Sequence, residues 1–484
     1  MNNIYKTKWN RATNTSVACS ELTSTHGRSK KAGLIGVVAA GLLVGNISSA
    51  YAACSADVAT GMTADAVVCS AALPTYTDST LGATILQAIN GGTLNLTNPN
   101  PTVSAIITTQ GKANNVAILA SGSGSTVNLT GAKINIANAT GYYYTMGISA
   151  ANNGTVNASG LVDVVSSGAV DDIGVGASGG GVVNLQNFKA YMTEDAGAAL
   201  NANSGGSINA KQVDITVDAK TGGFSYGIWV GNAVGNTPTT STITIEGGII
   251  RELGSGADSN SAIRVIDDNP RGDKGGSLVA NVTGDLVIET AGTGARGVYV
   301  SGKNTTIANL NNTKITTTGT IADGIEVGKI RSTGTGFGLV NSKGKLDIVT
   351  TNSGSAGIRV QYNCSEFKGD FATSSGSIKT AGTAVAFVPA ALQSVSGDVP
   401  VMNHDNVKVS LRNTTLDTTG TTSNLIQVGG LAGNIFGINK AQTYTNAQFN
   451  YLGSGGVATA GSNAWLINAT QNSTFTANIG ENAK

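Results

Sequence analysis

A short apolar unit recurs along most of this 484-residue chain and constrains its fold more than any other feature. Successive copies lie 25 to 35 residues apart. The strong copies are GIWV at 227–230, AIRV at 262–265, GVYV at 297–300, GIEV at 324–327 and GIRV at 357–360. The weaker copies are AILA at 117–120, GISA at 147–150, DIGV at 172–175, ALNA at 199–202 and AVAF at 384–387. We expect their second residues to form one inward-facing ladder of Ile118, Ile148, Ile173, Leu200, Ile228, Ile263, Val298, Ile325, Ile358 and Val385.

Each period also holds a second and a third unit of strand length. The second follows a corner rich in Gly, Ser and Asn, as in STVNL from Ser125 and GVVNL from Gly181. The third is looser, as in KINI from Lys133 and VDIT from Val213. Alternation within a unit points every second side chain inward, and the corner residues are typical of turns. Each period therefore predicts three short strands.

A period of this length with three strands excludes several repeat architectures. Leucine-rich repeats would show a Leu/Asn consensus, and a propeller blade needs four strands in about 40 residues. The pattern instead predicts an all-β fold, a right-handed parallel β-helix of about eleven or more coils, in which each strand stacks on its equivalent one coil away. Thin coils leave little room for rings, which agrees with an aromatic content of 5%.

A basic cluster and an apolar run precede the repeats. Arg28, Lys30 and Lys31 are followed by AGLIGVVAAGLLVG at 32–45. This run is shorter than the roughly 20 residues that span a bilayer, and Ala50-Tyr51-Ala52 fits a small-x-small cleavage site. We therefore expect an export signal that engages the Sec machinery through residues 1–52 and is cut after Ala52. A membrane anchor and a lipoprotein at Cys54 are the alternatives, the latter disfavoured by Tyr51.

The residues ahead of this signal carry a more specific pattern. It is formed by Met1-Asn2, Ile4-Tyr5-Lys6, Trp9-Asn10, Ala12-Thr13, Val17-Ala18 and Ser20-Glu21-Leu22. This frame resembles the extended signal-peptide region of type V secreted proteins of Gram-negative bacteria, the autotransporters and their relatives. Thr7 and Cys19 depart from the usual pattern. The resemblance implies a route of export and no particular activity.

The repeats behind the leader resemble the passenger domain of a pertactin-like autotransporter. The similarity lies in phrases such as GGVVNLQN and TKITTTGT within residues 116–390. It implies a rod that is exported through the periplasm and either displayed on the outer membrane or shed from it. The family's translocator barrel needs a long series of strands of roughly ten residues, which the sequence after Val385 does not supply. We expect a truncated gene product; a separate translocator is the alternative, with NPNP at 98–101 a partial match to an Asn-Pro-Asn-Gly signature.

Removal of the leader leaves a weakly acidic protein. The leader holds six of the 29 Lys and Arg residues and one of the 28 acids, which leaves 23 basic against 27 acidic residues. This balance provides no electrostatic attraction for nucleic acid or anionic lipid. Two function classes remain. We expect a non-catalytic passenger of adhesin type, and the alternative is a carbohydrate-active β-helix enzyme, either a polysaccharide lyase or a hydrolase.

An enzyme of this fold would need clustered carboxylates on one sheet. The candidate doublets are Asp171-Asp172 and Asp267-Asp268, but adjacent side chains on a strand point to opposite faces. We interpret both doublets as solvated corners. His404, the one histidine of the mature part, lies far from them in sequence, and no Gly-Asp-Ser-Gly or Gly-Asp-Ser-Leu string of protease or esterase passengers occurs. We expect no catalytic residue, metal site or cofactor.

Two long periods carry their extra residues in comparable places. GNAVGNTPTTS follows GIWV, and IDDNPRGDKGG follows AIRV. Equivalent corners of neighbouring coils lie side by side, so we expect one protrusion, of the kind that often carries recognition loops. The second insertion contains Arg271-Gly272-Asp273, which resembles an integrin-binding tripeptide; a simple turn is the alternative. The expected partner is a host receptor or a glycan. Tyr142-Tyr143-Tyr144 is a further candidate for sugar stacking, and we interpret it as covering a coil edge.

Cysteine positions and the start of the repeats divide the mature chain. Cys54 and Cys69 lie close together in a compartment that permits oxidation, and they predict a disulfide that caps the first coil. Cys364 has no expected mate. We expect an extended signal peptide at 1–52, an N-terminal cap with the first coils at 53–115, and the β-helix passenger at 116–484.

Overall fold

A computed structural model describes the chain as two units, residues 1–49 and 50–484. The described residues are 5–10, 15–20, 66–69, 76–78, 84–89, 91–96, 106–110, 116–137, 145–167, 171–193, 197–219, 224–231, 239–254, 260–267, 276–302, 305–331, 334–388, 402–432, 440–453 and 458–481. Every regular element among them is a β-strand. Accordingly, this part of the chain contains no helix able to cross a membrane.

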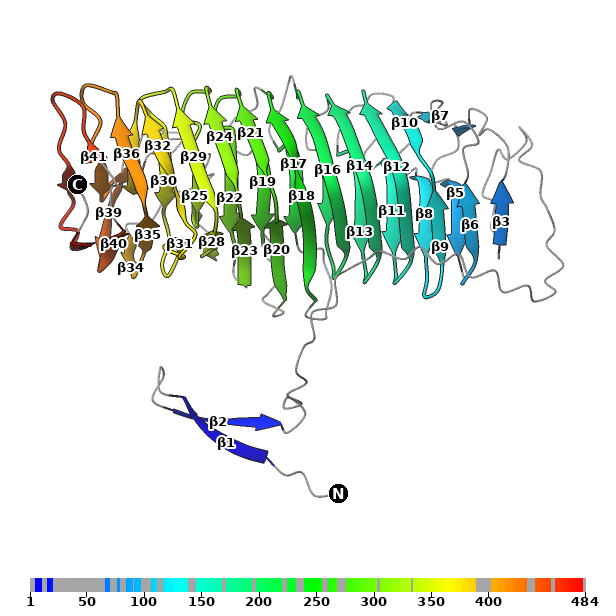
Figure 1. Cartoon of the computed structure of the whole chain (residues 1–484), viewed down its shortest axis with the longest axis horizontal. Helices are drawn as coiled ribbons and strands as arrows, with labels where there is room; N and C mark the ends of the chain where they lie inside the picture. Colours follow the sequence, from blue (N-terminus) through cyan, green and yellow to red (C-terminus); the bar gives the residue numbers. More distant parts are fainter. Residues whose placement is uncertain are drawn as a thin grey trace. The chain divides into compact units, whose positions relative to one another are not determined.

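The first unit contains a short antiparallel hairpin. Its strands are β1 (Tyr5–Asn10) and β2 (Thr15–Ser20), and Tyr5 pairs with Ser20. The second unit contains the predicted repeats, whose strands stack in chain order along its length (Figure 1).

The second unit has three strand-bearing faces. Face 1 is a 13-stranded parallel sheet. Its strands are β5 (Thr84–Ile89), β8 (Val116–Ser121), β11 (Met146–Ala151), β13 (Ile173–Ser178), β15 (Ala198–Ala202), β17 (Tyr226–Gly231), β19 (Ser261–Ile266), β22 (Arg296–Ser301), β25 (Ile325–Val327), β30 (Ala356–Val360), β33 (Thr383–Phe387), β37 (Ile426–Val428) and β42 (Ile467–Ala469).

Faces 2 and 3 together form one 23-stranded sheet. Face 2 contains β3 (Ala66–Cys69), β6 (Thr93–Leu96), β9 (Thr126–Leu129), β20 (Ser277–Val282), β23 (Thr305–Leu310), β28 (Leu339–Ser342), β31 (Glu366–Gly369), β35 (Lys408–Arg412), β40 (Ala447–Leu452) and β43 (Phe475–Ile479). Face 3 contains β4 (Tyr76–Asp78), β7 (Ile106–Gln110), β10 (Ala132–Ala137), β21 (Leu286–Thr290), β24 (Thr313–Thr317), β29 (Lys345–Thr350), β32 (Ser375–Thr380), β36 (Thr414–Thr418) and β41 (Ala458–Thr459).

Four long strands belong to both of these faces. They are β12 (Thr155–Ser166), β14 (Val182–Met192), β16 (Ser207–Val217) and β18 (Ser241–Glu252). The register between β12 and β14 shifts between Ala158 and Leu161, which marks the bend from face 2 to face 3. All strand pairs within the three faces are parallel, so the prediction of a parallel β-helix with three strand units per coil is confirmed.

Five further strands among the described residues of the second unit lie outside the three faces. β26 (Lys329–Arg331) and β27 (Gly334–Gly336) form an antiparallel hairpin. β34 (Met402–Asp405), β38 (Gly430–Ala432) and β39 (Lys440–Thr445) form a small mixed sheet.

The predicted ladder occupies face 1 with one correction. Ile148 pairs with Val175, whereas Ile173 pairs with Met146. The ladder position therefore belongs to Val175, and the prediction of Ile173 was wrong. In most copies a glycine stands directly before the ladder residue, and Gly174 in DIGV marks the same alignment. A Cβ on Gly174 would lie 2.7 Å from the carbonyl oxygen of Ala199, so the close approach of neighbouring coils requires glycine there.

The ladder also continues beyond the predicted copies. Leu86 precedes Ile118, and Ile426 and Ile467 follow Val385 in register. Most ladder residues are fully buried, as Ile118, Ile263 and Val298 illustrate, each with an exposed fraction of 0%. A continuous aliphatic column thus supplies the apolar burial that stabilises the coils.

A row of threonines lines the corner between face 3 and face 1. In register from coil to coil, it comprises Thr290, Thr317, Thr350, Thr380 and Thr418. The hydroxyl of Thr317 donates to the carbonyl of Ala322 over 2.7 Å, and that of Thr290 donates to Ala295 over 3.0 Å. These two buried hydroxyls satisfy backbone carbonyls at the corner.

Candidate functional site

Charged residues on face 1 lie on the side opposite the ladder. Glu326 and Arg359 directly follow the ladder residues Ile325 and Ile358, so they point away from the apolar column. They are nevertheless buried, with exposed fractions of 0% and 5%. Burial of charge is costly unless each ion has an opposite partner.

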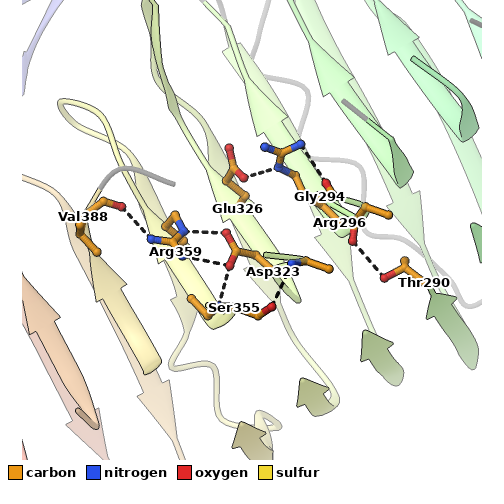
Figure 2. A network of polar contacts seen from close by, with 11 residues as sticks. Thr290, Gly294, Arg296, Asp323, Glu326, Ser355, Arg359 and Val388 are labelled. Carbon is orange, nitrogen blue, oxygen red and sulfur yellow. Dashed lines mark hydrogen bonds and ion pairs between the residues drawn. The ribbon is translucent and has the colours of Figure 1, made fainter. Parts of the chain in front are cut away.

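Two ion pairs supply those partners (Figure 2). The guanidinium of Arg296 donates to Glu326, and that of Arg359 donates to both oxygens of Asp323, over 2.6 Å and 3.1 Å. Asp323 also accepts the backbone N–H of Ala356 over 2.6 Å. These pairs join β22, β25 and β30, three successive strands of face 1.

Aromatic rings extend this cluster toward earlier coils. Arg264 lies 4.5 Å from the ring centroid of Tyr226 and donates to its hydroxyl over 2.6 Å. Arg296 lies 5.2 Å from the ring centroid of Tyr299. Cation–π contacts of desolvated arginines add to the stability of such an array.

The electrostatics of the cluster suit a structural role. Burial alone would lower the pKa of Arg296, but the adjacent Glu326 carboxylate outweighs it and raises that pKa. The pKa of Arg359 is raised in the same way by Asp323. Both guanidinium groups remain charged and paired, and neither carboxylate is left without a cation to act as a general base.

A ladder of asparagines runs along the outer surface of face 2. Each side-chain amide donates to the amide oxygen of the preceding coil: Asn128 to Asn95 (2.8 Å), Asn157 to Asn128 (2.9 Å), Asn184 to Asn157 (2.9 Å) and Asn209 to Asn184 (2.9 Å). Thr244 takes the next place, and the ladder resumes with Asn281 to Thr244 (3.2 Å), Asn309 to Asn281 (2.8 Å) and Asn341 to Asn309 (2.8 Å). An amide has two N–H groups and two lone pairs, so each rung retains one donor and one acceptor for another partner.

A groove follows this ladder at the bend between faces 2 and 3. It has a volume of about 360 Å³ and is lined by Asn157, Asn184 and Asn209 on one wall. Lys211 and Glu246 lie among the lining residues at the bend. The groove thus combines a regular row of amides with apolar side chains such as Leu185 and a few charged groups, which suits a largely uncharged ligand with polar and apolar faces.

A second hollow lies at the same bend on later coils. It has a volume of about 330 Å³, and its lining includes Asp285, Asn312, Lys345 and Asp347. Burial alone would raise the pKa of Asp347, but hydrogen bonds from Lys345 and Ser377 and the lysine charge outweigh it and lower that pKa. Asp347 is therefore an ionised, partnered acid rather than a proton donor.

The sequence-predicted binding and disulfide residues fall outside the described part of the chain. The structure does not describe Arg271, Gly272, Asp273, Tyr142–Tyr144 or Cys54. It describes the backbone of Cys69 but not its side chain. The predicted tripeptide site and the Cys54–Cys69 disulfide stay predictions. The strands that lead into the two insertions are neighbours, since Gly231 pairs with Ile266. Cys364 is exposed and not in a disulfide with any described cysteine.

The solvated-corner interpretation was wrong for two of the candidate acids. Asp172 is fully buried and accepts a hydrogen bond from the hydroxyl of Ser166 over 2.7 Å. Asp267 is 7% exposed. Both lie at corners where a polar side chain can bond the turn, which is why burial there is tolerated. Asp172 precedes β13 and Asp267 follows β19, so the structure does not bring them together.

His404 is a buried residue of the small mixed sheet. Its Nε2 lies 2.9 Å from the Gln442 amide oxygen, and its ring lies 4.7 Å from that of Tyr444 between centroids. Burial lowers its pKa, with Gln442 opposing the shift. The ring packs in the core beside Tyr444, whose hydroxyl donates to the carbonyl of Gln361 over 2.9 Å. Within the described ranges, no group of three potential metal ligands occurs.

The asparagine ladder was not predicted from the sequence. The signal was present, because Asn recurs at the same place in TVNL, TVNA, VVNL and SINA. That place alternates with buried Val and Leu, which predicts an outward side chain.

Comparison with known proteins identifies the leader. Residues 1–50 match the family model described as Extended Signal Peptide of Type V secretion system. No curated protein and no solved structure matches the chain. The chain therefore carries a type V export signal in front of a parallel β-helix, and this combination supports an autotransporter passenger.

Proposed function

We infer that this protein is a non-catalytic, adhesin-like passenger that binds a glycan with the outer surface of face 2. The observation that carries the proposal is the asparagine ladder beside the groove of about 360 Å³. Its amides repeat once per coil, at about 4.8 Å, and each offers a donor and an acceptor to ligand hydroxyls. The leader supports delivery through the periplasm toward the cell surface or the medium.

The distribution of charge supports binding rather than catalysis. A glycosidase needs two carboxylates flanking one bond. Among the residues that line the groove, Glu246 is the one acid. The acids of the face 1 cluster are buried in ion pairs and do not border this groove.

A matched pair of variants tests the proposal. Asn184→Ala with Asn209→Ala removes amides from the groove, whereas Asn309→Ala with Asn341→Ala removes equivalent ladder amides outside it. The exported chain is purified and screened on a glycan array, and the affinity of a retained glycan is measured by calorimetry. We expect the groove variant to bind about tenfold more weakly or worse, because each lost hydrogen bond costs about 1 kcal/mol. The control should bind as the wild type does.

Two results would count against the proposal. One is that the array retains no glycan, and the other is that both double variants bind equally well. Incubation of a retained glycan with the protein, followed by product analysis, addresses the enzyme alternative. Cleavage products that vanish in Glu246→Gln would favour a carbohydrate-active enzyme.

A further inference from the structure

Four charged residues of alternating sign form a row on the outer surface of face 3. Lys133 pairs in register with Asp163, Asp163 with Lys189, and Lys189 with Asp214. They lie on the adjacent strands β10, β12, β14 and β16, one strand spacing apart. We call this row the charge row.

Three members of the charge row are not consumed by ion pairs within the chain. Asp214 pairs with Arg251 over 2.8 Å, and both side chains are partly exposed. Lys133, Asp163 and Lys189 form no ion pair with any residue that the structure describes. Their charges are half-buried or exposed on the surface and remain open to another molecule.

Apolar groups lie beside the middle of the charge row. Val165 pairs with Tyr191 two residues further along the same strands, and Tyr191 is 39% exposed. Asn135 and Thr216 occupy the corresponding places on the outer two coils. The surface therefore has an apolar centre with a polar surround, as protein interfaces commonly do.

From β10 to β16 the charges run Lys, Asp, Lys, Asp, and in the opposite direction they run Asp, Lys, Asp, Lys. The charge row is therefore complementary to a reversed copy of itself. If two copies face each other with their rods antiparallel, a twofold axis along the strand direction relates them. Lys133 then faces Asp214 of the second copy and Asp163 faces Lys189, while Val165 faces Tyr191. A parallel arrangement without offset would place like charges opposite each other or leave the charges without partners. The antiparallel twofold closes the assembly at two copies.

We propose that a second copy of this chain docks on the charge row, giving an antiparallel dimer of β-helices. A patch four coils long and five residues wide covers roughly 320 Å² per copy from the strand spacing and rise. That area lies at the low end of protein interfaces and indicates a weak, salt-sensitive association. The inference goes beyond glycan binding, because face 3 is distinct from the amide wall of the groove.

Variants with a reversed charge, measured alone and as a mixture, distinguish this dimer from charges that act only within one chain. Lys189→Asp puts Asp opposite Asp163 of the partner copy, and Asp163→Lys puts Lys opposite Lys189. Each variant should weaken self-association by about 10- to 100-fold. An equal mixture of the two variants should form a heterodimer, and the exchanged variant Asp163→Lys with Lys189→Asp should dimerise like the wild type.

Sedimentation equilibrium of the full exported chain at low and high salt measures these outcomes. Thermal unfolding shows whether each variant is folded. If a variant with one reversed charge does not fold, the exchanged variant still tests the proposal. The proposal is overturned if the wild type stays monomeric up to about 200 µM in low salt, a range that detects sub-millimolar dissociation constants. It is equally overturned if single reversals dimerise like the wild type, or if mixing them restores nothing.

Discussion

Arg359 donates from Nε and Nη2 of its guanidinium to the two carboxylate oxygens of Asp323 in the neighbouring coil, over 2.6 Å and 3.1 Å. The pair is buried on the outer side of face 1, with side-chain exposures of 6% and 1%. Together with Arg296 and Glu326, it connects three coils through side chains in addition to the backbone ladder.

Breaking this pair should destabilise the rod. Asp323→Ala leaves a buried guanidinium without its carboxylate, and we expect the free energy of unfolding to fall by about 3–5 kcal/mol. Urea unfolding followed by circular dichroism measures the change. Asp214→Ala, which removes the partly exposed pair with Arg251, is the matched control and should cost about 1 kcal/mol or less. Equal losses in both variants would contradict the prediction.

Glu252 should make stability depend on pH. It is fully buried at the end of β18, and burial raises its pKa well above 4.5, with Asp218 adding to the shift and the Gly254 N–H opposing it. A raised folded-state pKa means that its contribution to stability is present below about pH 4.5 and is lost as pH rises. Glu252→Gln should therefore unfold at a higher temperature than the wild type at pH 7, and at a similar one near pH 4.

Glu246 offers the control for this experiment, since it lies on the same strand but is exposed. Glu246→Gln should change the midpoint of unfolding by no more than about a degree or two at either pH. A neutral-pH midpoint of Glu252→Gln at or below that of the wild type would refute the assigned direction.

His404 should act in the opposite pH direction. Its pKa is lowered from 6.5 by burial, with the Gln442 hydrogen bond opposing. A lowered pKa means that stability is complete above about pH 6.5 and declines as pH falls, by at most about 1.4 kcal/mol per pH unit for one proton. Denaturant titrations between pH 7.5 and 5 should show this decline, and His404→Gln should reduce it. An unchanged slope in that variant would assign the decline to other groups.

Two glycines of β13 should differ in their tolerance of alanine. A Cβ on Gly174 would meet the Ala199 carbonyl oxygen at 2.7 Å, whereas one on Gly176 would meet the flexible Met146 sulfur at 3.4 Å. Gly174→Ala should lower the free energy of unfolding by about 1–3 kcal/mol, and Gly176→Ala by less than about 1 kcal/mol. Chemical denaturation of both variants compares them, and the reverse order would show that Gly174 does not set the coil spacing.

The Arg271-Gly272-Asp273 tripeptide is tested on cells. If the tripeptide contacts an integrin, Asp273→Glu should abolish most attachment of displayed protein to integrin-bearing cells, because the added methylene displaces the carboxylate. Asp285→Glu, between β20 and β21, should leave attachment unchanged. Attachment by Asp273→Glu at the wild-type level would remove the integrin hypothesis and leave the glycan proposal unaffected.

The periodicity of the sequence was enough to predict the coils. Gly-Ile-x-Val units recur at intervals that match the length of one coil. An aliphatic residue that points inward in every coil packs on its equivalents in the neighbouring coils and forms a column. The ladder residue of the DIGV copy was the exception. DIGV offers two apolar residues of the correct parity, and only the pairing of Ile148 with Val175 selects one.

The candidate surfaces required the tertiary structure. Asn157, Asn184 and Asn209 are separated by 27 and 25 residues, and nothing local shows that their amides bond in a line. Burial of Glu326 and Arg359 likewise depends on what covers the outer side of face 1, which no single strand specifies. The sequence by itself determined the leader, the repeat and the apolar column, because each is written in neighbouring residues. Only the stacking of coils decided which polar groups meet, because those contacts join residues about one full coil apart.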